Sequence, residues 1–251
     1  MNAIELRGVT LRRRTQEEMS YDLKGLIFHS LTNRYRKPKR RTVLSDVTIS
    51  IAKGEKIGII GPNGSGKSTL LKVICGILTP SAGAVTVSGR IAPLIELGAG
   101  FDPNMSVVDN IVFYGVLLGF PEADMRARVH SILMFAELED HAREPLKALS
   151  SGMLARLGFG IATDVHPDIL LLDEVLSVGD QNFRAKSNAR MQQLWTEHST
   201  IILVSHELEF IENSCTRALW MQDGRVAMLG SAAEVTASYR SSAGVPPLLP
   251  V

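Results

Sequence analysis

The stretch Gly61-Pro62-Asn63-Gly64-Ser65-Gly66-Lys67-Ser68-Thr69 decides the fold of this 251-residue chain. Its first eight residues match the pattern G-x-x-x-x-G-K-[S/T], which forms a phosphate-binding loop when a strand precedes it and a helix follows it. Residues 56–60 are typical of an apolar strand, and helical spacing continues after the loop to Cys75, where Gly76 suits the end of the helix. The motif therefore lies in the context that it requires.

The loop is expected to bind phosphate mainly through its backbone. Glycines at positions 61, 64 and 66 let N–H groups turn inward around phosphate oxygens, and the N-terminus of the following helix adds its positive end. Lys67 would reach the β- and γ-phosphates, and the Ser68 hydroxyl would ligate Mg²⁺. A chance glycine-rich turn is the weaker interpretation.

The rest of the chain alternates apolar strands with helices. Residues 169–172 and 201–204 are continuous apolar runs, typical of strands buried on both faces, and such strands between helices imply a parallel sheet of the α/β class. Residues 4–11 alternate apolar and polar side chains and predict a first strand at a sheet edge. Further strands are expected at 43–51, 85–87 and 91–97, and helices over most of 107–135, with breaks at Gly119 and Pro121, and over 153–163.

Acidic side chains follow one of the buried strands directly. Asp173 and Glu174 come at the carboxyl end of 169–172, where open parallel sheets bind their ligands. Asp173 would hold Mg²⁺ through its water shell, and Glu174 would polarise the water that attacks the γ-phosphate. His206 follows 201–204 and would contact the γ-phosphate from the same edge. Each residue alone would more commonly be structural. The phosphate loop reverses that balance for Asp173 and Glu174, and the order of the motifs reverses it for His206.

Over residues 1 to about 240 the sequence resembles the ATP-binding-cassette nucleotide-binding subunits, a P-loop NTPase family. In that family a phosphate loop, a glutamine loop, a serine-glycine signature, an acidic strand end, an aspartate loop and a switch histidine follow one another. The signature matches Leu149-Ser150-Ser151-Gly152-Met153, and the aspartate loop matches Ser177-Val178-Gly179-Asp180. The resemblance implies a mostly parallel central sheet, an antiparallel β subdomain, a helical subdomain at about 102–163 and a short tail at 241–251.

The resemblance also implies a head-to-tail homodimer with two ATP molecules sandwiched between the subunits. Ser150 and Gly152 would open a helix whose N-terminus binds the γ-phosphate of the nucleotide on the second copy. Ser151 and Asp180 belong to the same implied nucleotide contact. Hydrolysis would then reset the dimer.

Departures from the common pattern indicate a subfamily. The signature is SSGM rather than SGGQ, and Glu96 replaces the usual loop glutamine, where it would ligate Mg²⁺ but crowd Asp173 with like charge. With Leu-Ser-Val-Gly-Asp after Glu174, these features are similar to the ATPases that export lipid-linked O-antigen, capsule or teichoic acid. That similarity implies an integral membrane permease that handles the lipid-linked glycan, and a peripheral position at the cytoplasmic face of the inner membrane.

The sequence offers two candidates for the residue that stacks on adenine. In the family an aromatic residue shortly after the first strand contacts the base, yet Arg12-Arg13-Arg14 occupies this place here. Arg13 would stack through its guanidinium plane. Tyr35 is the alternative.

Charge is concentrated near the N-terminus. The chain has 27 Lys and Arg against 26 Asp and Glu, but residues 1–56 hold 13 cations and 6 anions. Residues 21–33 predict an amphipathic helix, and six cations in 34–41 predict an exposed loop. This part of the chain favours anionic lipid headgroups or a substrate pyrophosphate as much as simple solvation. We expect no nucleic acid as partner, because interleaved aromatic platforms are missing.

Composition excludes several other classes of protein. The 45% hydrophobic and 21% charged residues exclude disordered and collagen-like chains, and Cys75 and Cys215 have neither disulfide-framework nor zinc spacing. The N-terminus does not resemble a signal peptide, and the longest apolar stretch, 111–120, is too short to span a bilayer.

The alternatives to glycan export are an ABC ATPase for another lipid or a drug, and a non-transport ABC protein.

Overall fold

A computed structural model of the chain describes residues 1–14, 40–95, 98, 100–165, 167–173, 181–196 and 199–243. The expected helix at 21–33 and residues 34–39 of the expected basic loop lie outside these ranges. Arg40 and Arg41, which we expected in that loop, instead begin strand β2 (Arg40–Ala52). The strand continues to its basic end because Arg40 and Arg41 pair with Arg14 and Arg13 of the neighbouring strand.

In the described residues, six strands form the larger sheet, and its mostly parallel character confirms the expected α/β fold. Their order is β5 (Ile91–Leu94), β6 (Ile169–Asp173), β7 (Thr200–Val204), β3 (Lys56–Ile60), β8 (Arg217–Gln222) and β9 (Arg225–Ser231). Neighbouring strands from β5 to β8 run parallel, and β9 pairs with β8 antiparallel. The carboxyl ends of β3, β6 and β7 therefore meet at one edge.

A smaller antiparallel sheet covers the larger one and has the order β2, β1 (Asn2–Arg14) and β4 (Ala82–Val87). The expectation that the first strand lies at a sheet edge is wrong, since β1 is the middle strand and pairs with both neighbours. Alternation reports that one face of a strand is buried and the other polar, which is equally true of a central strand in a one-sided antiparallel sheet.

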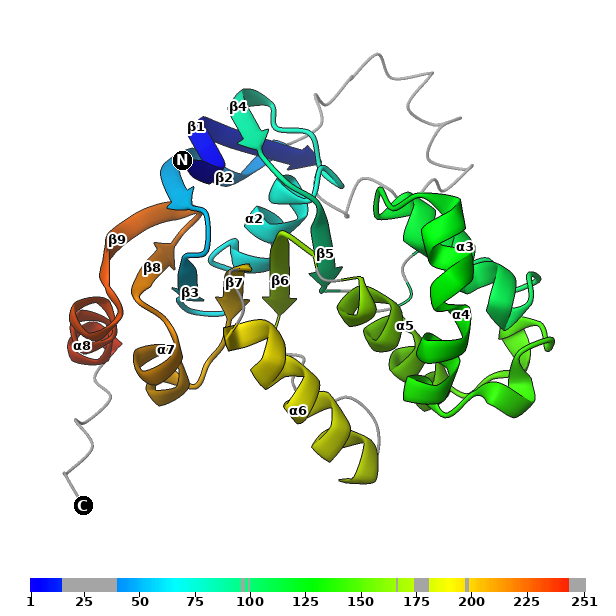
Figure 1. Ribbon diagram of the computed structural model, residues 1–251. Helices are drawn as coiled ribbons and strands as arrows, with labels where there is room; N and C mark the ends of the chain where they lie inside the picture. The colour runs from blue at the N-terminus through cyan, green and yellow to red at the C-terminus, as the bar shows by residue number, and fades with distance from the viewer. Residues whose placement is uncertain are drawn as a thin grey trace, which may run out of the picture.

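The helices lie between the two sheets, at the β5 end of the larger sheet, and on the face of the larger sheet opposite the smaller one (Figure 1). In chain order they are α2 (Lys67–Ile74), α3 (Val107–Leu117), α4 (Glu122–Ala136), the short 3-10 turns η2 (Glu139–His141) and η3 (Leu146–Ala148), α5 (Ser151–Asp164), α6 (Gln181–Thr196), α7 (Leu208–Ser214) and α8 (Ala232–Ala243). The expected break between α3 and α4 is confirmed: Gly119 has φ +87° and Pro121 caps α4. Within the described residues, no helix is both long and apolar enough to cross a bilayer.

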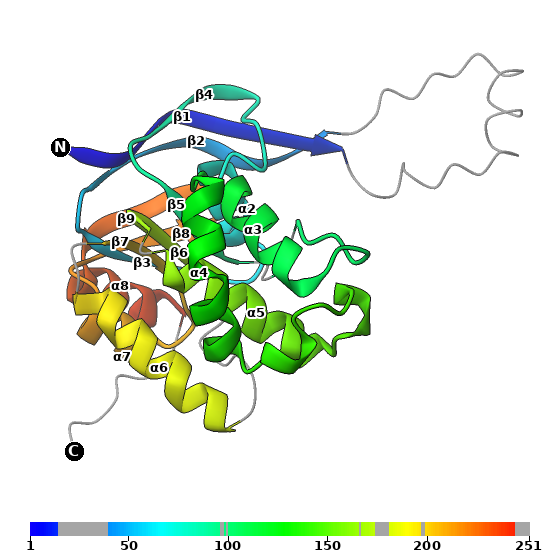
Figure 2. The same ribbon diagram turned by 45° about the vertical axis from the view of Figure 1, so that its right-hand side comes forward.

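Side chains of the central strands alternate between two buried layers. On β3, Ile57 and Ile59 pack with α2 and the antiparallel sheet, whereas Ile60 packs on the opposite side with α6, α7 and α8. Residues 169–172 and 201–204 alternate in the same way, which explains why these strands are apolar without interruption. Figures 1 and 2 show the antiparallel sheet on one side of the parallel sheet and α6, α7 and α8 on the other.

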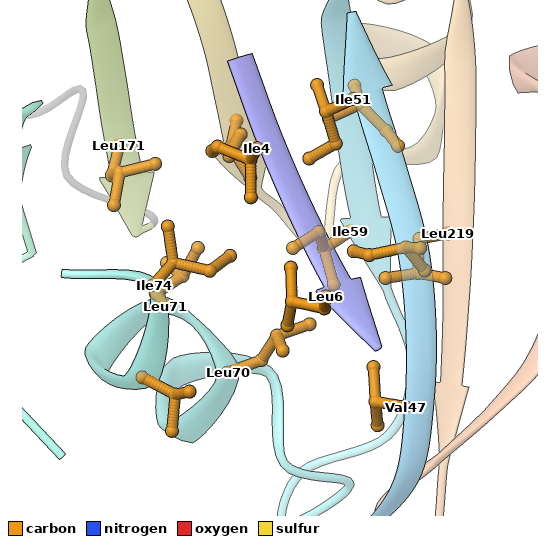
Figure 3. Close-up of a cluster of buried hydrophobic side chains, with 14 of the residues drawn as sticks. Ile4, Leu6, Val47, Ile51, Ile59, Leu70, Leu71, Ile74, Leu171 and Leu219 are labelled. Carbon is orange, nitrogen blue, oxygen red and sulfur yellow. The ribbon is translucent and has the colours of Figure 1, made fainter. Parts of the chain in front are cut away.

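Helix α2 is enclosed between the two sheets and carries the phosphate loop at its N-terminus. Leu70, Leu71 and Ile74 face Ile4 and Leu6 of β1 in this layer (Figure 3). All five side chains are at most 2% exposed. Full burial of each such side chain contributes roughly 1.5–3 kcal/mol, so this packing fixes the helix and the loop that precedes it.

Candidate nucleotide-binding site

The phosphate loop joins β3 to α2 and is built on glycines with positive φ. Gly61, Gly64 and Gly66 have φ values of +143°, +78° and +105°. A Cβ at Gly61 would lie 2.1 Å from the carbonyl oxygen of Met221, whereas one at Gly64 would meet no described atom within 4 Å. The loop therefore packs closely against the Met221 backbone at Gly61 and has open space beside it at Gly64. Gly66 caps α2 without a side-chain hydrogen bond in the described structure, which leaves the helix N-terminus accessible to an anion.

Lys67 is held over its own loop. Its Nζ donates hydrogen bonds to the carbonyl oxygens of Gly61 at 2.8 Å and Pro62 at 3.1 Å. Burial lowers the pKa of Lys67, and the negative charge of Asp173 opposes this shift. The ammonium group is thus positioned at the loop, near the carboxylate that ends β6.

A cleft of about 560 Å³ lies over the loop. It is lined by Arg41, Thr42, Val43, Asn63, Gly64, Gly66, Lys67, Ser68, Thr69, Asp173, Val204, His206, Asp223 and Gly224. The larger sheet has the order β6-β7-β3-β8, so Asp173 and His206 approach the loop from one side of β3. The turn between β8 and β9 approaches from the other side.

The expected phosphate and metal residues meet in this cleft. Lys67, Ser68 and Thr69 line it together with Asn63, Gly64 and Gly66. Asp173, from the end of β6, and His206, two residues beyond β7, reach the same space, as the strand order requires. Gly61, Pro62 and Ser65 belong to the loop but do not line the cleft. Ser65 Oγ is buried and has no hydrogen-bond partner in the described structure.

The signature residues lie apart from this cleft. Ser150 is the N-cap of α5, and its Oγ accepts a hydrogen bond from the backbone N–H of Met153 at 3.3 Å. Ser150, Ser151 and Gly152 are exposed, and a Cβ at Gly152 would contact no described atom within 4 Å. The sequence prediction that these residues open a helix is confirmed, and none of them lines the cleft of its own chain.

Three expected site residues, Glu96, Glu174 and Asp180, lie outside the described residues, as does Tyr35. Arg13 is described, but it is not among the residues that line the cleft. Its direct cross-strand partner Arg41 lines the cleft instead.

Arg41, Thr42, Val43, Asp223 and Gly224 are the lining residues that sequence reasoning missed. Thr42 and Val43 lie on a strand that is otherwise ordinary, and nothing in the sequence marks which of its residues face the loop. Asp223-Gly224 is recognisable as a hairpin turn, and the residues have φ +49° and +75°. The turn's position beside the phosphate loop follows only from the order of the strands.

Oxygen ligands in the cleft fit Mg²⁺. Ser68 offers a hydroxyl and Asp173 a carboxylate, which are donors that this hard cation prefers. Across the described ranges, no three His, Cys, Asp or Glu side chains gather to hold a metal by themselves. A metal here would share its ligand sphere with phosphate oxygens and water, as Mg²⁺ does in nucleotide sites.

Comparisons with known proteins agree with this site. The ABC transporter family profile matches residues 44–177, which is more than half of the chain. An O-antigen export system ATP-binding protein from Myxococcus xanthus is 48% identical over 201 residues, covering 80% of this chain and 46% of that protein. One from Klebsiella pneumoniae is 36% identical over 240 residues, covering 95% of this chain and 98% of that protein. The chain thus spans less than half of one relative and nearly all of the other.

A solved structure shares the fold. It is an ATP-binding cassette in a dimeric post-hydrolysis state with ADP and phosphate, at 22% identity and a TM-score of 0.67, covering 91% of this chain and 98% of that chain. The family profile, the Klebsiella relative that matches along its whole length and the phosphate loop with its cleft lead to one conclusion: the chain belongs to the ABC transporter family.

Proposed function

We propose that this chain binds and hydrolyses ATP with Mg²⁺ as the ATP-binding subunit of an exporter for a lipid-linked polysaccharide. The observation that carries the ATPase assignment is the convergence of Lys67, Ser68, Asp173 and His206 on one cleft over the phosphate loop. The relatives named for O-antigen export support the substrate class, with capsule and teichoic acid as related glycans.

Four side chains of the cleft have roles that their chemistry suits. The loop N–H groups and Lys67 bind the β- and γ-phosphates, and Ser68 and Asp173 hold Mg²⁺. When bound, Mg²⁺ neutralises part of the phosphate charge. His206 donates a hydrogen bond to the γ-phosphate from the end of β7. Glu174 follows Asp173 directly in the chain, and we assign it the role of general base toward the attacking water.

A second copy of the chain completes the site in this proposal. Ser150, Ser151 and Gly152 form an exposed helix N-terminus, and none of them lines the cleft of its own chain. Such a terminus binds an anion well, so it would take the γ-phosphate held by the second copy, with Asp180 at the same contact. The dimeric state of the solved ATP-binding cassette supports this arrangement.

A permease is the other partner. We propose that an integral membrane permease carries the lipid-linked glycan and that this subunit docks on it at the cytoplasmic face of the membrane. Nucleic acid has no part in the proposal. Glu96 would add a further metal ligand in place of the usual glutamine.

Two substitutions test the ATPase assignment. Glu174→Gln removes the general base, so ATP binding is retained and turnover falls about 100-fold or more. Lys67→Ala removes a phosphate ligand, so ATP affinity itself falls. Equilibrium binding and steady-state hydrolysis are measured for both variants. Rapid hydrolysis by Glu174→Gln would remove Glu174 from this role, and unchanged ATP affinity in Lys67→Ala would contradict the phosphate-loop assignment.

Co-purification tests the exporter assignment. The chain is isolated with the permease encoded beside it, and the lipid bound to the complex is identified by mass spectrometry. A lipid-linked glycan supports the proposal. A lipid without sugar, or stimulation of ATP hydrolysis by drugs alone, would favour an ABC ATPase for another substrate.

A further inference from the structure

The cleft has two chemically different ends on either side of β3. Asp173 and His206 lie on the β6 and β7 side, where the metal and the γ-phosphate are expected. Arg41 and Asp223 lie on the opposite side, where the β8–β9 turn meets β2. A triphosphate bound along the loop with its γ-phosphate at Asp173 therefore directs its nucleoside toward Arg41 and Asp223.

The turn that contains Asp223 is hydrogen-bonded to the phosphate loop and to β2. The backbone N–H of Gly224 donates to the carbonyl oxygen of Ser65 at 2.9 Å, and Gly224 accepts from the N–H of Ser45 at 2.8 Å. A Cβ at Gly224 would lie 2.2 Å from the carbonyl oxygen of Val43. The position of Asp223 is thus set by hydrogen bonds of the neighbouring Gly224 to the phosphate loop and to β2.

Asp223 is a charged side chain without a structural partner. It is exposed, and neither it nor Arg41 makes a side-chain hydrogen bond or ion pair with any other part of the chain that the structure describes. Asp223 lies in a tight hairpin turn, where aspartate is favoured because it tolerates positive φ, here +49°. The turn does not require that the carboxylate line a nucleotide cleft.

We propose that Asp223 recognises the nucleoside, accepting a hydrogen bond from the base amino group or a ribose hydroxyl, while Arg41, at the same end of the cleft, presents its guanidinium plane to the base. The inference rests on the proposed function, because it takes ATP as the ligand. It adds a selection step that the phosphate loop cannot supply, since the loop contacts only groups that all nucleoside triphosphates share.

The change in ATP affinity on removal of the Asp223 charge distinguishes a carboxylate that binds the nucleoside from one that only lines the cleft. A carboxylate that only lines an anion site repels the triphosphate, and removing its charge then tightens binding. A carboxylate that binds the nucleoside contributes a hydrogen bond to a charged group, and removing it weakens binding. The two interpretations therefore predict opposite effects of the same substitution.

The test compares Asp223→Asn and Asp223→Gly with the wild-type chain. Both replacements tolerate positive φ, so the turn is retained. Asp46→Asn and Asp46→Gly are matched controls, because Asp46 is also exposed, has φ +56° and does not line the cleft. Calorimetric titration in EDTA, which prevents hydrolysis, measures binding of ATP, inosine triphosphate, 2′-deoxy-ATP, 3′-deoxy-ATP and inorganic tripolyphosphate.

We expect Asp223→Gly to weaken ATP binding about tenfold and Asp223→Asn somewhat less, because the amide oxygen still accepts a hydrogen bond. Tripolyphosphate binding stays equal or becomes tighter, and the Asp46 variants match wild type. The analogue that already binds wild type weakly, and is not weakened further by Asp223→Gly, identifies the donor as the base amine or a ribose hydroxyl.

Two outcomes would overturn the inference: Asp223 variants that bind ATP as tightly as wild type or more tightly, and an equal loss for ATP and tripolyphosphate. Arg41→Gln is compared with Arg13→Gln in the same titrations, and a larger loss of ATP affinity in Arg13→Gln would contradict the place given to Arg41. A wild-type chain that binds no ATP even when Mg²⁺ is present would instead refute the proposed function, so the two failures are distinguishable.

Discussion

At the scale of single residues, the turn at Gly224 joins the phosphate loop to β2, and it can be tested with a matched glycine. Gly224 and Gly76 have φ values of +75° and +73°, but a Cβ at Gly224 would overlap the Val43 carbonyl oxygen, whereas one at Gly76 meets no described atom within 4 Å. Gly76→Ala should cost about 1 kcal/mol of unfolding free energy. Gly224→Ala should cost at least about 2 kcal/mol more, since backbone must move.

Urea denaturation measures both variants, and ATP titration follows the site. Gly224→Ala should also weaken ATP binding, because the displaced turn pulls on Ser65 in the loop. Equal destabilisation by the two substitutions would mean that the turn is not held against β2.

The two cysteines give a second residue-scale prediction. Burial raises the pKa of both Cys75 and Cys215 from 9.0 to about 12. The native chain should therefore react with Ellman's reagent at pH 8 about a thousandfold more slowly than the urea-unfolded chain, because the thiolate is the reactive form. Since the folded-state pKa is the higher one, stability should fall as pH rises from 9 toward 12. Fast labelling of the native chain at pH 8 would contradict this burial.

The sequence predicted the cleft residues around the phosphate loop and missed those at the opposite end. Lys67, Ser68 and Asp173 were predictable because each follows from a motif or from the end of an apolar strand. Arg41 and Asp223 were not predictable, because their place depends on cross-strand register and on β8 lying beside β3. Arg13 stands directly opposite Arg41, and only three-dimensional pairing tells which arginine reaches the cleft.

At the scale of elements, the central strands were the most predictable feature and the edges were the least. Strands β6 and β7 are buried on both faces, so their sequences are apolar without a break. The predicted edge position of β1 was wrong because an alternating pattern reports only that one face of a strand is polar. It does not report how many strands pair with that strand. The start of β2 was missed because a run of cations is typical of a loop, whereas backbone pairing with β1 continues through Arg41 and Arg40.

Helices α4, α5 and α6 are joined by a buried carboxylate. Asp164 at the end of α5 is 8% exposed and contacts Arg128 of α4 at 3.1 Å and Arg190 of α6 at 3.7 Å. Asp164→Asn should lower the unfolding free energy by about 2 kcal/mol, less than for a fully buried pair because both arginines are partly exposed. Denaturant unfolding measures this loss.

An exposed ion pair on the same helices is the control. Arg126 and Glu122 lie one turn apart on α4 at 2.7 Å, and both side chains are more than 60% exposed. Glu122→Gln should cost about 0.5 kcal/mol or less. A similar small effect of Asp164→Asn would show that the three helices are held by apolar packing alone.

At the scale of the whole molecule, a substitution at Gly152 should disturb the assembly of two copies without disturbing the folding of either copy. Gly152 is exposed in the first turn of α5, so Gly152→Asp meets open space in the single chain and favours the helix N-terminus by its charge. ATP affinity of the single chain and its unfolding midpoint should therefore match or exceed wild type. Hydrolysis should fall about 100-fold, because the new carboxylate repels the γ-phosphate brought by a second copy. Normal hydrolysis by this variant would place the signature helix outside the site.

The proposed mechanism requires above all that each copy completes the nucleotide pocket of the other. The most direct test is the mass of the Glu174→Gln chain, purified without a permease and measured by light scattering with and without saturating ATP and Mg²⁺. We expect a pair of ATP-binding subunits that forms only with nucleotide and is lost when Gly152→Asp is added. Subunits that stay single with nucleotide, or a pair that Gly152→Asp leaves intact, would contradict this mechanism.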